Sequence, residues 1–592
     1  MLDLITPMSQ VLLSWLLLFL LFSGLGMLLL KLLGKSFKSG WDWLDSFWLG
    51  WALSLAVLQI WHLVLPVNET ILLLLALIAA YQLFSLRASA ARLLHRLSNE
   101  RAYMLVMAPL ALWMSNRALA MPTAYDTGFR DIQAVMWLDA YPIVPGLGNL
   151  FSSLAFNHSV YLYDALLDAS IWTGRSHHIS TGLLLMVYLA QATRSAQNLL
   201  NCRAEGAVRW SWILAALTIP YILFYTVGRS GITHFLTDTV VDVVGFVCVA
   251  YMLDFFQDRN LRASDRRFLV SRLAILILVG LTIKQTFVVF GLALAATVLR
   301  VWLKRGGYSQ DRARAARSLK LTTVLGCVII VPWLARGVLT SGYIAFPQPV
   351  GRVEVDWAIP HDQLLSRQRT MSTNTRIRGG AQAEVLGSWD WLGPWLRKFV
   401  SNIMPTMLPS LISAVAFGLF TLGRFRNRGM NRARDPGVLA LAPMLIMLAF
   451  WFFTFPEPKY IRYMLWSLAA VSVILVFEAW STVNLRLRIL AVAGLAALCL
   501  AYVALLIVGR QSYPLPAGPD DGYYDHWPVP YDQYVTNSGL QLNVPRGDGT
   551  QCWQVPLPCT PYPDARLEER VPGELRHGFR IAGIAEAATA SE

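Results

Sequence analysis

Residues 124–159 read AYDTGFRDIQAVMWLDAYPIVPGLGNLFSSLAFNHS, and this stretch decides how the rest of the chain is interpreted. It directly follows a long apolar segment, yet its Asp, Asn, Pro and Gly residues make it too polar and too broken to cross a bilayer. A connection this long is usually functional or disordered, and its aromatic residues argue against disorder. We therefore expect an ordered outer loop over residues 122–179, with two short helices that lie in the membrane interface and turn aromatic faces toward lipid.

The composition points to a membrane protein. The chain has 592 residues, of which 56% are hydrophobic and only 15% are charged. Ordinary soluble domains are much richer in charge. The net charge of +14 does not indicate nucleic-acid binding, because Lys and Arg fall mainly in short connections between apolar segments.

Fourteen apolar segments come near the roughly 20 residues that a membrane-spanning helix needs. They lie near residues 11–33, 44–66, 69–86, 103–121, 180–200, 210–227, 239–256, 268–284, 286–303, 320–340, 400–423, 437–455, 464–480 and 489–509. The predicted fold class is therefore an all-α polytopic membrane protein with about fourteen transmembrane helices.

Basic residues gather in every second connection between these segments. The clusters lie near residues 31–38, 87–101, 194–209, 259–272, 304–320, 424–434 and 486–488. Because basic loops stay in the cytoplasm, all seven clusters share one side and both termini lie outside.

This topology divides the chain into five parts. Three N-terminal helices occupy residues 1–102, and seven helices with the first outer loop occupy 103–340. A second outer loop covers 341–399, the last helices cover 400–509, and an outer tail covers 510–592. In the tail, Cys552 and Cys559 of CWQVPLPC lack further ligands for a metal and indicate a disulfide in a small cap with some β-structure.

Ionisable residues cluster at the predicted outer ends of the helices, where charge is costly and therefore suggests function. Asp126 follows a helix end, while Asp238 and Asp242 lie one turn apart at the start of another. Asp238 suits a helix N-cap equally well. Lys284 stands at a tight hairpin, where it is either a snorkelling lysine or a point charge for phosphate.

Other candidate binding residues come from the same side of the membrane. Neighbouring polar positions are Tyr125, Arg130, Asp131, His158, His234, Lys459, Arg462 and Tyr463. The arginines of the second outer loop either hold an anionic ligand or lipid headgroups, or are solvated surface; they are Arg352, Arg367, Arg369, Arg376 and Arg378. No nucleotide-binding, zinc-protease or serine-hydrolase motif competes with this interpretation.

The layout resembles the GT-C glycosyltransferases, membrane enzymes that take sugar from a polyprenyl-phosphate or polyprenyl-diphosphate carrier. The resemblance is carried by the first long loop with its YD pair, the six helices before a second large loop, Asp238 in HFLTDTVVD, and the PKYIRY turn. The chain is also similar to uncharacterised bacterial membrane proteins that share PGLGNL, SGY-x-x-FP and CW-x-x-PLPC.

The resemblance implies a periplasm-facing transferase in the bacterial inner membrane. Its donor would be a polyprenyl-phosphate sugar and its acceptor a glycan, lipid or protein. The transfer would invert the configuration at the anomeric carbon of the sugar. The catalytic residues would be Asp126, as general base, and Asp238, which would orient the acceptor or help to bind a divalent ion. Lys284 with Arg462 or Lys459 would hold phosphate. No cofactor is required for a monophosphate carrier, although Mg or Mn is not excluded.

Two alternatives remain open. A lipid-linked glycan transporter or flippase also suits fourteen helices, but the sequence has no internal repeat, and its polar residues gather on one side. An O-antigen polymerase or ligase shares this sidedness but relies on arginines, which the second loop supplies.

Overall fold

The computed structural model describes residues 2–35, 42–85, 100–122, 124–204, 208–230, 232–235, 237–258, 262–305, 312–426, 436–480, 483–510, 529–547 and 549–582. Most of the predicted basic clusters at 87–101 and 424–434, together with residues 511–528 and the end of the tail from residue 583, lies outside these ranges.

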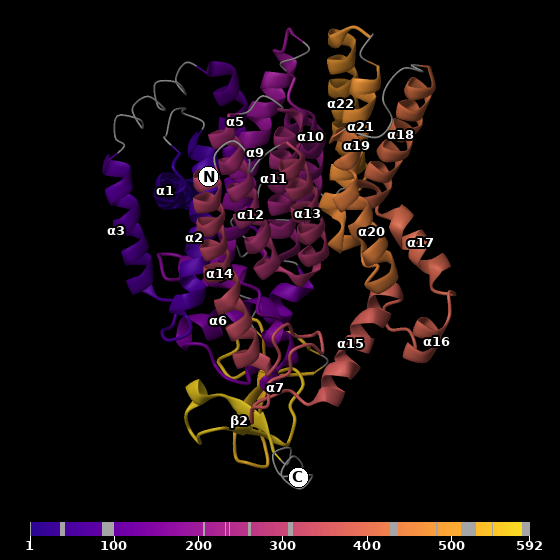
Figure 1. Ribbon diagram of the computed structural model, residues 1–592. Helices are drawn as coiled ribbons and strands as arrows, with labels where there is room; N and C mark the ends of the chain where they lie inside the picture. Colours follow the sequence, from indigo (N-terminus) through magenta and orange to yellow (C-terminus); the bar gives the residue numbers. More distant parts are fainter. Residues whose placement is uncertain are drawn as a thin grey trace.

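Long helices form a bundle that extends over most of the molecule (Figure 1). The N-terminal helices are α1 (Leu2–Leu32), α2 (Asp42–Trp61) and α3 (Glu69–Ser85). The central ones are α5 (Arg101–Arg117), α9 (Ser180–Leu200), α10 (Trp210–Pro220), continued by η5 (Tyr221–Ser230), α11 (Thr237–Gln257), α12 (Ala263–Ile283), η6 (Gln285–Phe287), α13 (Val288–Lys304) and α14 (Arg312–Ser341). The C-terminal ones are η7 (Ile403–Met407), α18 (Leu408–Arg426), α19 (Pro436–Leu439), α20 (Ala442–Thr454), η8 (Pro458–Tyr460), α21 (Arg462–Ala479) and α22 (Leu485–Arg510).

The structure supports a helical membrane protein but not the count of fourteen spans. A helix lies at each predicted segment, yet nine helices in the described part of the chain are long and apolar enough to cross a membrane. Polar and charged residues explain part of the difference. For example, α12 begins ASDRRF, so its first turns are too charged for the hydrocarbon core.

Small residues allow the first two helices to approach closely. A Cβ at Gly26 would overlap the Ser46 carbonyl, and one at Gly50 would overlap the Phe22 carbonyl. Such contacts are typical of membrane helices, because lipid provides no hydrophobic force between them and packing must supply it.

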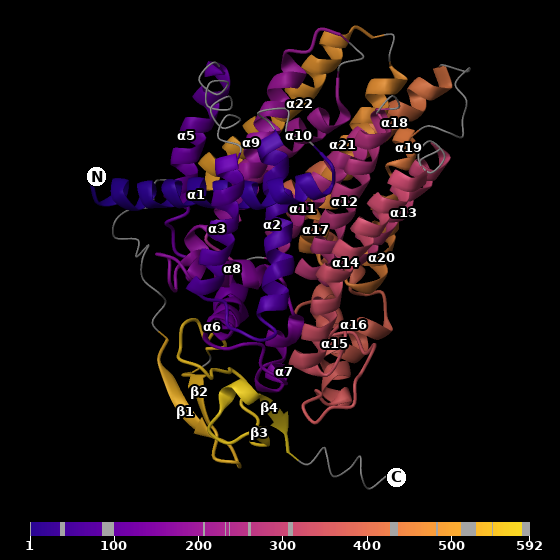
Figure 2. The same cartoon turned by 60° about the vertical axis from the view of Figure 1, so that its left-hand side comes forward.

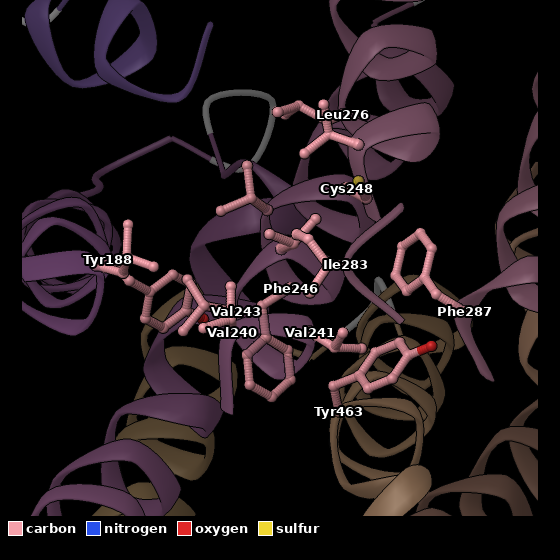
Figure 3. Packing of buried hydrophobic residues seen from close by; sticks show 14 of the residues in the cluster. Tyr188, Val240, Val241, Val243, Phe246, Cys248, Leu276, Ile283, Phe287 and Tyr463 are labelled. Atoms are coloured by element: carbon pink, nitrogen blue, oxygen red, sulfur yellow. The ribbon is translucent and has the colours of Figure 1, made fainter. Parts of the chain in front are cut away.

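Aromatic and aliphatic side chains fill the space between the central helices (Figure 3). Phe246 of α11 packs against Tyr188 of α9, while Tyr463 of α21 packs against Phe287 and Phe290. The C-terminal helix α21 is thus built into the same core as the central helices.

The first outer loop is ordered, as expected, but its helices do not turn aromatic faces toward lipid. It contains η1 (Thr127–Asp131), α6 (Ile132–Ala140), α7 (Leu147–Leu150), η2 (Ser152–Phe156), α8 (Val160–Asp168) and η3 (Ser176–His178). Every residue of α8 is buried, and so is Trp137 of α6. The interfacial prediction is therefore wrong, because amphipathic spacing does not distinguish a lipid surface from a protein surface.

Two further segments gather at the same end of the bundle, which we call the cap end (Figures 1 and 2). The second loop forms α15 (His361–Arg376), α16 (Gln382–Gly387) and α17 (Leu392–Ser401). The tail, residues 529–582, pairs β1 (Tyr531–Val535) with β2 (Gln541–Pro545), and β3 (Leu567–Glu569) with β4 (Phe579–Ile581), all antiparallel; η9 (Leu575–His577) precedes β4. A disulfide joins Cys552 to Cys559 within it.

The tail is packed directly onto the first loop. The Trp553 backbone N–H donates to the Gly128 carbonyl at 2.9 Å, and the Gln133 side chain donates to the carbonyls of Trp553 and Val555. A Cβ at Gly128 would overlap the Trp553 ring. The disulfide-closed segment therefore fixes the backbone two residues from Asp126.

We predict that Gly128→Ala loosens the tail. The added methyl group has no space beside Trp553, so the change should cost about 1–3 kcal/mol. Limited trypsin digestion of the purified protein should release the tail faster, whereas Gly393→Ala, with open space around it, should not change the rate. Equal rates for both variants would contradict this packing.

Candidate functional site

Four charged side chains from distant parts of the sequence meet at the cap end. Asp126 follows α5, Asp238 lies in the first turn of α11, Lys284 directly follows α12, and Lys459 lies in η8. Lys284 Nζ is 2.5 Å from Asp238, and Lys459 Nζ is 3.3 Å from Asp126 and 3.9 Å from Asp238. We call these four residues the charge cluster.

Lys459 is the most accessible member of the charge cluster. Its side chain is 41% exposed, against 29% for Asp126, 12% for Lys284 and 8% for Asp238. Both lysines also lie near the Tyr460 ring, with distances to its centroid of 4.8 Å for Lys284 and 5.7 Å for Lys459. An incoming anion therefore meets Lys459 first, with Lys284 behind it.

The neighbouring cations keep Asp126 ionised. Burial raises the pKa of this carboxyl, but the positive charges of Arg130 and Lys459 outweigh burial, so the pKa lies below its usual value. In the opposite sense, burial lowers the pKa of Lys459, but Asp238 and Asp126 raise it above its usual value. Both groups are thus charged at neutral pH.

A π-helical turn places the next two predicted residues beside the charge cluster. In η1, Arg130 contacts Asp131 at 2.8 Å and lies 3.8 Å from Asp126. The Tyr161 hydroxyl donates to Asp131 at 2.5 Å. Such widened turns often occur at functional sites, and this one links Asp126 to the buried part of the loop.

Asp242 and Arg462 form a second ion pair one helical turn further along α11. The distance between them is 3.0 Å, and the Tyr221 hydroxyl donates to Asp242 at 2.7 Å. Both charged side chains are almost fully buried. Arg462 is thus neutralised by a carboxylate, so Lys459 is the more available phosphate ligand of this turn.

His158 contacts the backbone next to Lys284 of the charge cluster. Its Nδ1 is 2.8 Å from the carbonyl of Ile283, the residue before Lys284, and burial lowers its pKa well below the usual value. It also lines a cavity of about 40 Å³ with His62 and Arg336. His158 therefore orients the Lys284 backbone and stays neutral.

Three of the predicted residues, Tyr125, His234 and Tyr463, make their contacts outside the charge cluster. The Tyr125 side chain is 45% exposed, and its hydroxyl contacts Thr550 of the tail. His234 is buried, and its carbonyl accepts a hydrogen bond from Thr181 of α9 at 2.7 Å. Tyr463 is 1% exposed and belongs to the hydrophobic core, as Figure 3 shows, instead of facing a substrate.

Sequence reasoning did not single out Tyr161 or Arg367. Tyr161 was one of several aromatic residues of the loop, and Arg367 was one of five arginines of the second loop. Only the fold distinguishes Arg367, since its guanidinium and that of Arg130 lie 6.0 Å and 5.6 Å from the centroid of the same Phe156 ring.

An apolar cavity of about 200 Å³ lies elsewhere, between α12, α13 and α14. Its lining includes Arg267, near the start of α12, whereas Lys284 follows the end of that helix. The lining extends along α12 as far as Ile277 and includes no member of the charge cluster, so the cavity is a separate feature.

In the described part of the chain, no group of three His, Cys, Asp or Glu side chains is arranged to hold a metal ion. The Lys459 ammonium instead lies between the carboxylates of Asp126 and Asp238.

Taken together, the apolar helices and the charge cluster define a helical membrane protein with an ionic site at one end of its bundle. A model of a domain of unknown function, DUF8201, matches residues 8–466, so the protein belongs to the DUF8201 family. All four residues of the charge cluster lie within the match, while the tail lies beyond it. A search of curated proteins and a search of solved structures found no match.

We predict that Asp131 makes stability depend on pH. Burial raises its pKa to about 6, although Arg130 opposes the shift, so the folded state binds this proton more tightly than the unfolded state does. Stability should therefore fall as the pH rises, and between about pH 5 and 7 this single group should cost about 1 kcal/mol.

Thermal unfolding of the wild type and Asp131→Asn at the two pH values tests this prediction. The melting temperature of the wild type relative to the variant should be higher at the lower pH. The exposed Asp362→Asn should show no such change. A difference between the wild type and Asp131→Asn that does not vary with pH would contradict it.

Proposed function

We propose that the protein is a membrane glycosyltransferase that moves a sugar from a polyprenyl-phosphate carrier to an acceptor hydroxyl, with the charge cluster as its active site. Its main support is the convergence of Asp126 and Asp238 with Lys284 and Lys459, which are separated by up to 333 residues in sequence. A carboxylate beside two ammonium groups offers both a proton acceptor and a phosphate ligand.

In the proposed reaction, the acceptor oxygen attacks the anomeric carbon of the sugar. Its proton passes to the Asp126 carboxylate, and the bond from the anomeric carbon to the carrier phosphate breaks. The electron pair of that bond leaves with the phosphate oxygen, where Lys284 and Lys459 stabilise the added negative charge. A single displacement of this kind inverts the anomeric centre.

Donor binding would also activate the base. In the free protein, Arg130 and Lys459 together hold the pKa of Asp126 low, and Lys459 is shared between Asp126 and Asp238. A phosphate that attracts Lys459 would weaken its bond to Asp126 and raise the pKa of that carboxyl toward the reaction pH, where a general base is most effective. Asp238, held by Lys284, would keep that lysine in place for the phosphate.

The proposed setting is the bacterial inner membrane, with the cap end in the periplasm and a glycan, lipid or protein as acceptor. The clustering of the charged residues at one end of the bundle favours a one-sided enzyme over a transporter. Conduction would need a polar path through the bundle, whereas the core beside Asp242 is filled by Phe246, Phe287 and Tyr463.

The first test of the proposal is Asp126→Asn. The amide has nearly the same shape but is a poor proton acceptor, so transfer to the acceptor should fall by about 10²- to 10⁴-fold. Transfer is scored as loss of one cell-envelope glycoform at equal protein abundance. The exposed Asp390→Asn should leave the glycoform unchanged. Normal glycans in the Asp126→Asn strain would refute the role of Asp126.

The second test concerns phosphate binding by Lys459. Farnesyl phosphate should bind to the purified protein, while farnesol, which has the same hydrocarbon but no charge, should bind much more weakly. Lys459→Gln should reduce the affinity for farnesyl phosphate about ten-fold by removing one charge-assisted contact.

Isothermal titration of both compounds provides the measurement. Lys398→Gln is the matched control, since Lys398 of α17 is exposed and pairs with Glu457 instead of with a carboxylate of the charge cluster. Equal affinities for the phosphate and the alcohol would contradict a phosphate site.

A further inference from the structure

Exposed aromatic rings form a surface next to Asp126, built from two distant segments. The Tyr125 ring stacks on Phe129 with centroids 5.3 Å apart, and Tyr562 of the tail lies 6.4 Å from Phe129 and 6.1 Å from Phe151. Tyr125 is 45% exposed and Tyr562 is 56% exposed, while Phe151 beneath them is 5% exposed. We call Tyr125 and Tyr562, with their supporting rings, the aromatic shelf.

The shelf is held rigidly. The Tyr125 hydroxyl contacts Thr550, and its carbonyl accepts a hydrogen bond from the Gln551 side chain at 2.8 Å. Both partners belong to the tail. Rigid aromatic rings with a polar hydroxyl give a large contact area at low entropic cost, which suits a ligand with an apolar face and a polar edge. A pyranose ring has this character, with C–H bonds on its faces and hydroxyls at its rim.

Arg367 of α15 supplies a positive charge that the protein leaves without a carboxylate partner. Its Nη2 donates to the Ser153 hydroxyl at 2.8 Å, but its Nε is buried and has no hydrogen-bond partner among the described residues. Within those residues, no carboxylate lies within 4.0 Å of it. Arg130, on the same Phe156 ring, is neutralised by Asp131 instead.

The charges around Arg367 make this site suitable for an anion. Arg367 lies over the same Phe156 ring as Arg130, which is 3.8 Å from Asp126, and its hydrogen-bond partner Ser153 is two residues from Phe151 of the aromatic shelf. A planar guanidinium matches the two oxygens of a carboxylate better than an ammonium does. Arg367 is partly buried and has one neutral side-chain partner, so a carboxylate would compensate for the water that its guanidinium has lost.

We propose that Arg367 and the aromatic shelf form the acceptor subsite for an acidic saccharide, whose ring packs on Tyr125 and Tyr562 and whose carboxylate pairs with Arg367. As an acceptor subsite it rests on the proposed transferase function. The subsite joins the first loop, the second loop and the tail, and it explains why the tail is packed against the loop that carries Asp126.

The test measures binding without any donor. Methyl glucuronide and methyl glucoside differ in one carboxylate, and their binding to the purified full-length protein is followed by titration with ligand-observed NMR. The glucuronide should bind about ten-fold more tightly, which is the effect of one charge-assisted pair. Equal affinities, or no binding of either compound, would overturn the proposal.

Substitutions assign the effect to these residues. Arg367→Gln should abolish the preference for the glucuronide, while Arg367→Lys should retain part of it, because the charge remains and the planar fork is lost. Tyr562→Ala should weaken the binding of both compounds. Arg369→Gln, at an exposed position of the same helix, should change neither the affinity for the glucuronide nor the affinity for the glucoside. An unchanged preference in Arg367→Gln would overturn the proposal.

The result is separable from the transferase hypothesis. If the glucuronide preference depends on Arg367 while Asp126→Asn leaves cellular glycans unchanged, the acidic-saccharide site stands and the transfer reaction falls. If Asp126→Asn removes a glycoform but the glucuronide shows no preference, the opposite holds.

Discussion

The contact of Lys459 with both Asp126 and Asp238 connects the parts of this protein that matter most. Charged groups at the edge of a membrane bundle persist only when they are paired, because their desolvation is costly. Asp126 comes from the loop after α5, Asp238 from α11, and Lys459 from the turn between α20 and α21. Loss of this contact would remove the one ammonium group that touches both carboxylates, with Lys284 still paired to Asp238 and Arg130 near Asp126.

Packing brings these charges together. Tyr463 and Trp466 of α21 lie in the core between α10, α11 and α13, so the turn that carries Lys459 cannot move independently of Asp238. The ion pair between Arg462 and Asp242 adds a second connection one turn deeper. The site is thus mounted on helices, which hold functional groups more accurately than free loops do.

The tail has a comparable role for the first loop. Trp553 covers Gly128, and the Gln133 side chain binds the backbone of the disulfide-closed segment. These contacts hold η1, the π-helical turn that connects Asp126 to α6, in place. The tail lies beyond the part of the chain that matches the DUF8201 family, so it completes a site whose charged residues belong to the family region.

The sequence by itself determined the helical class, the positions of the long helices and the ionisable residues worth attention, because apolar runs and isolated charges are local patterns. Only the tertiary structure decided which charges pair. Asp238 and Asp242 are one turn apart on the same helix, yet one meets Lys284 and Lys459 while the other meets Arg462. The same holds for the burial of α8, for the core position of Tyr463 and for Arg367, which has no carboxylate partner among the described residues. Each depends on contacts between segments far apart in sequence, which spacing along the chain does not encode.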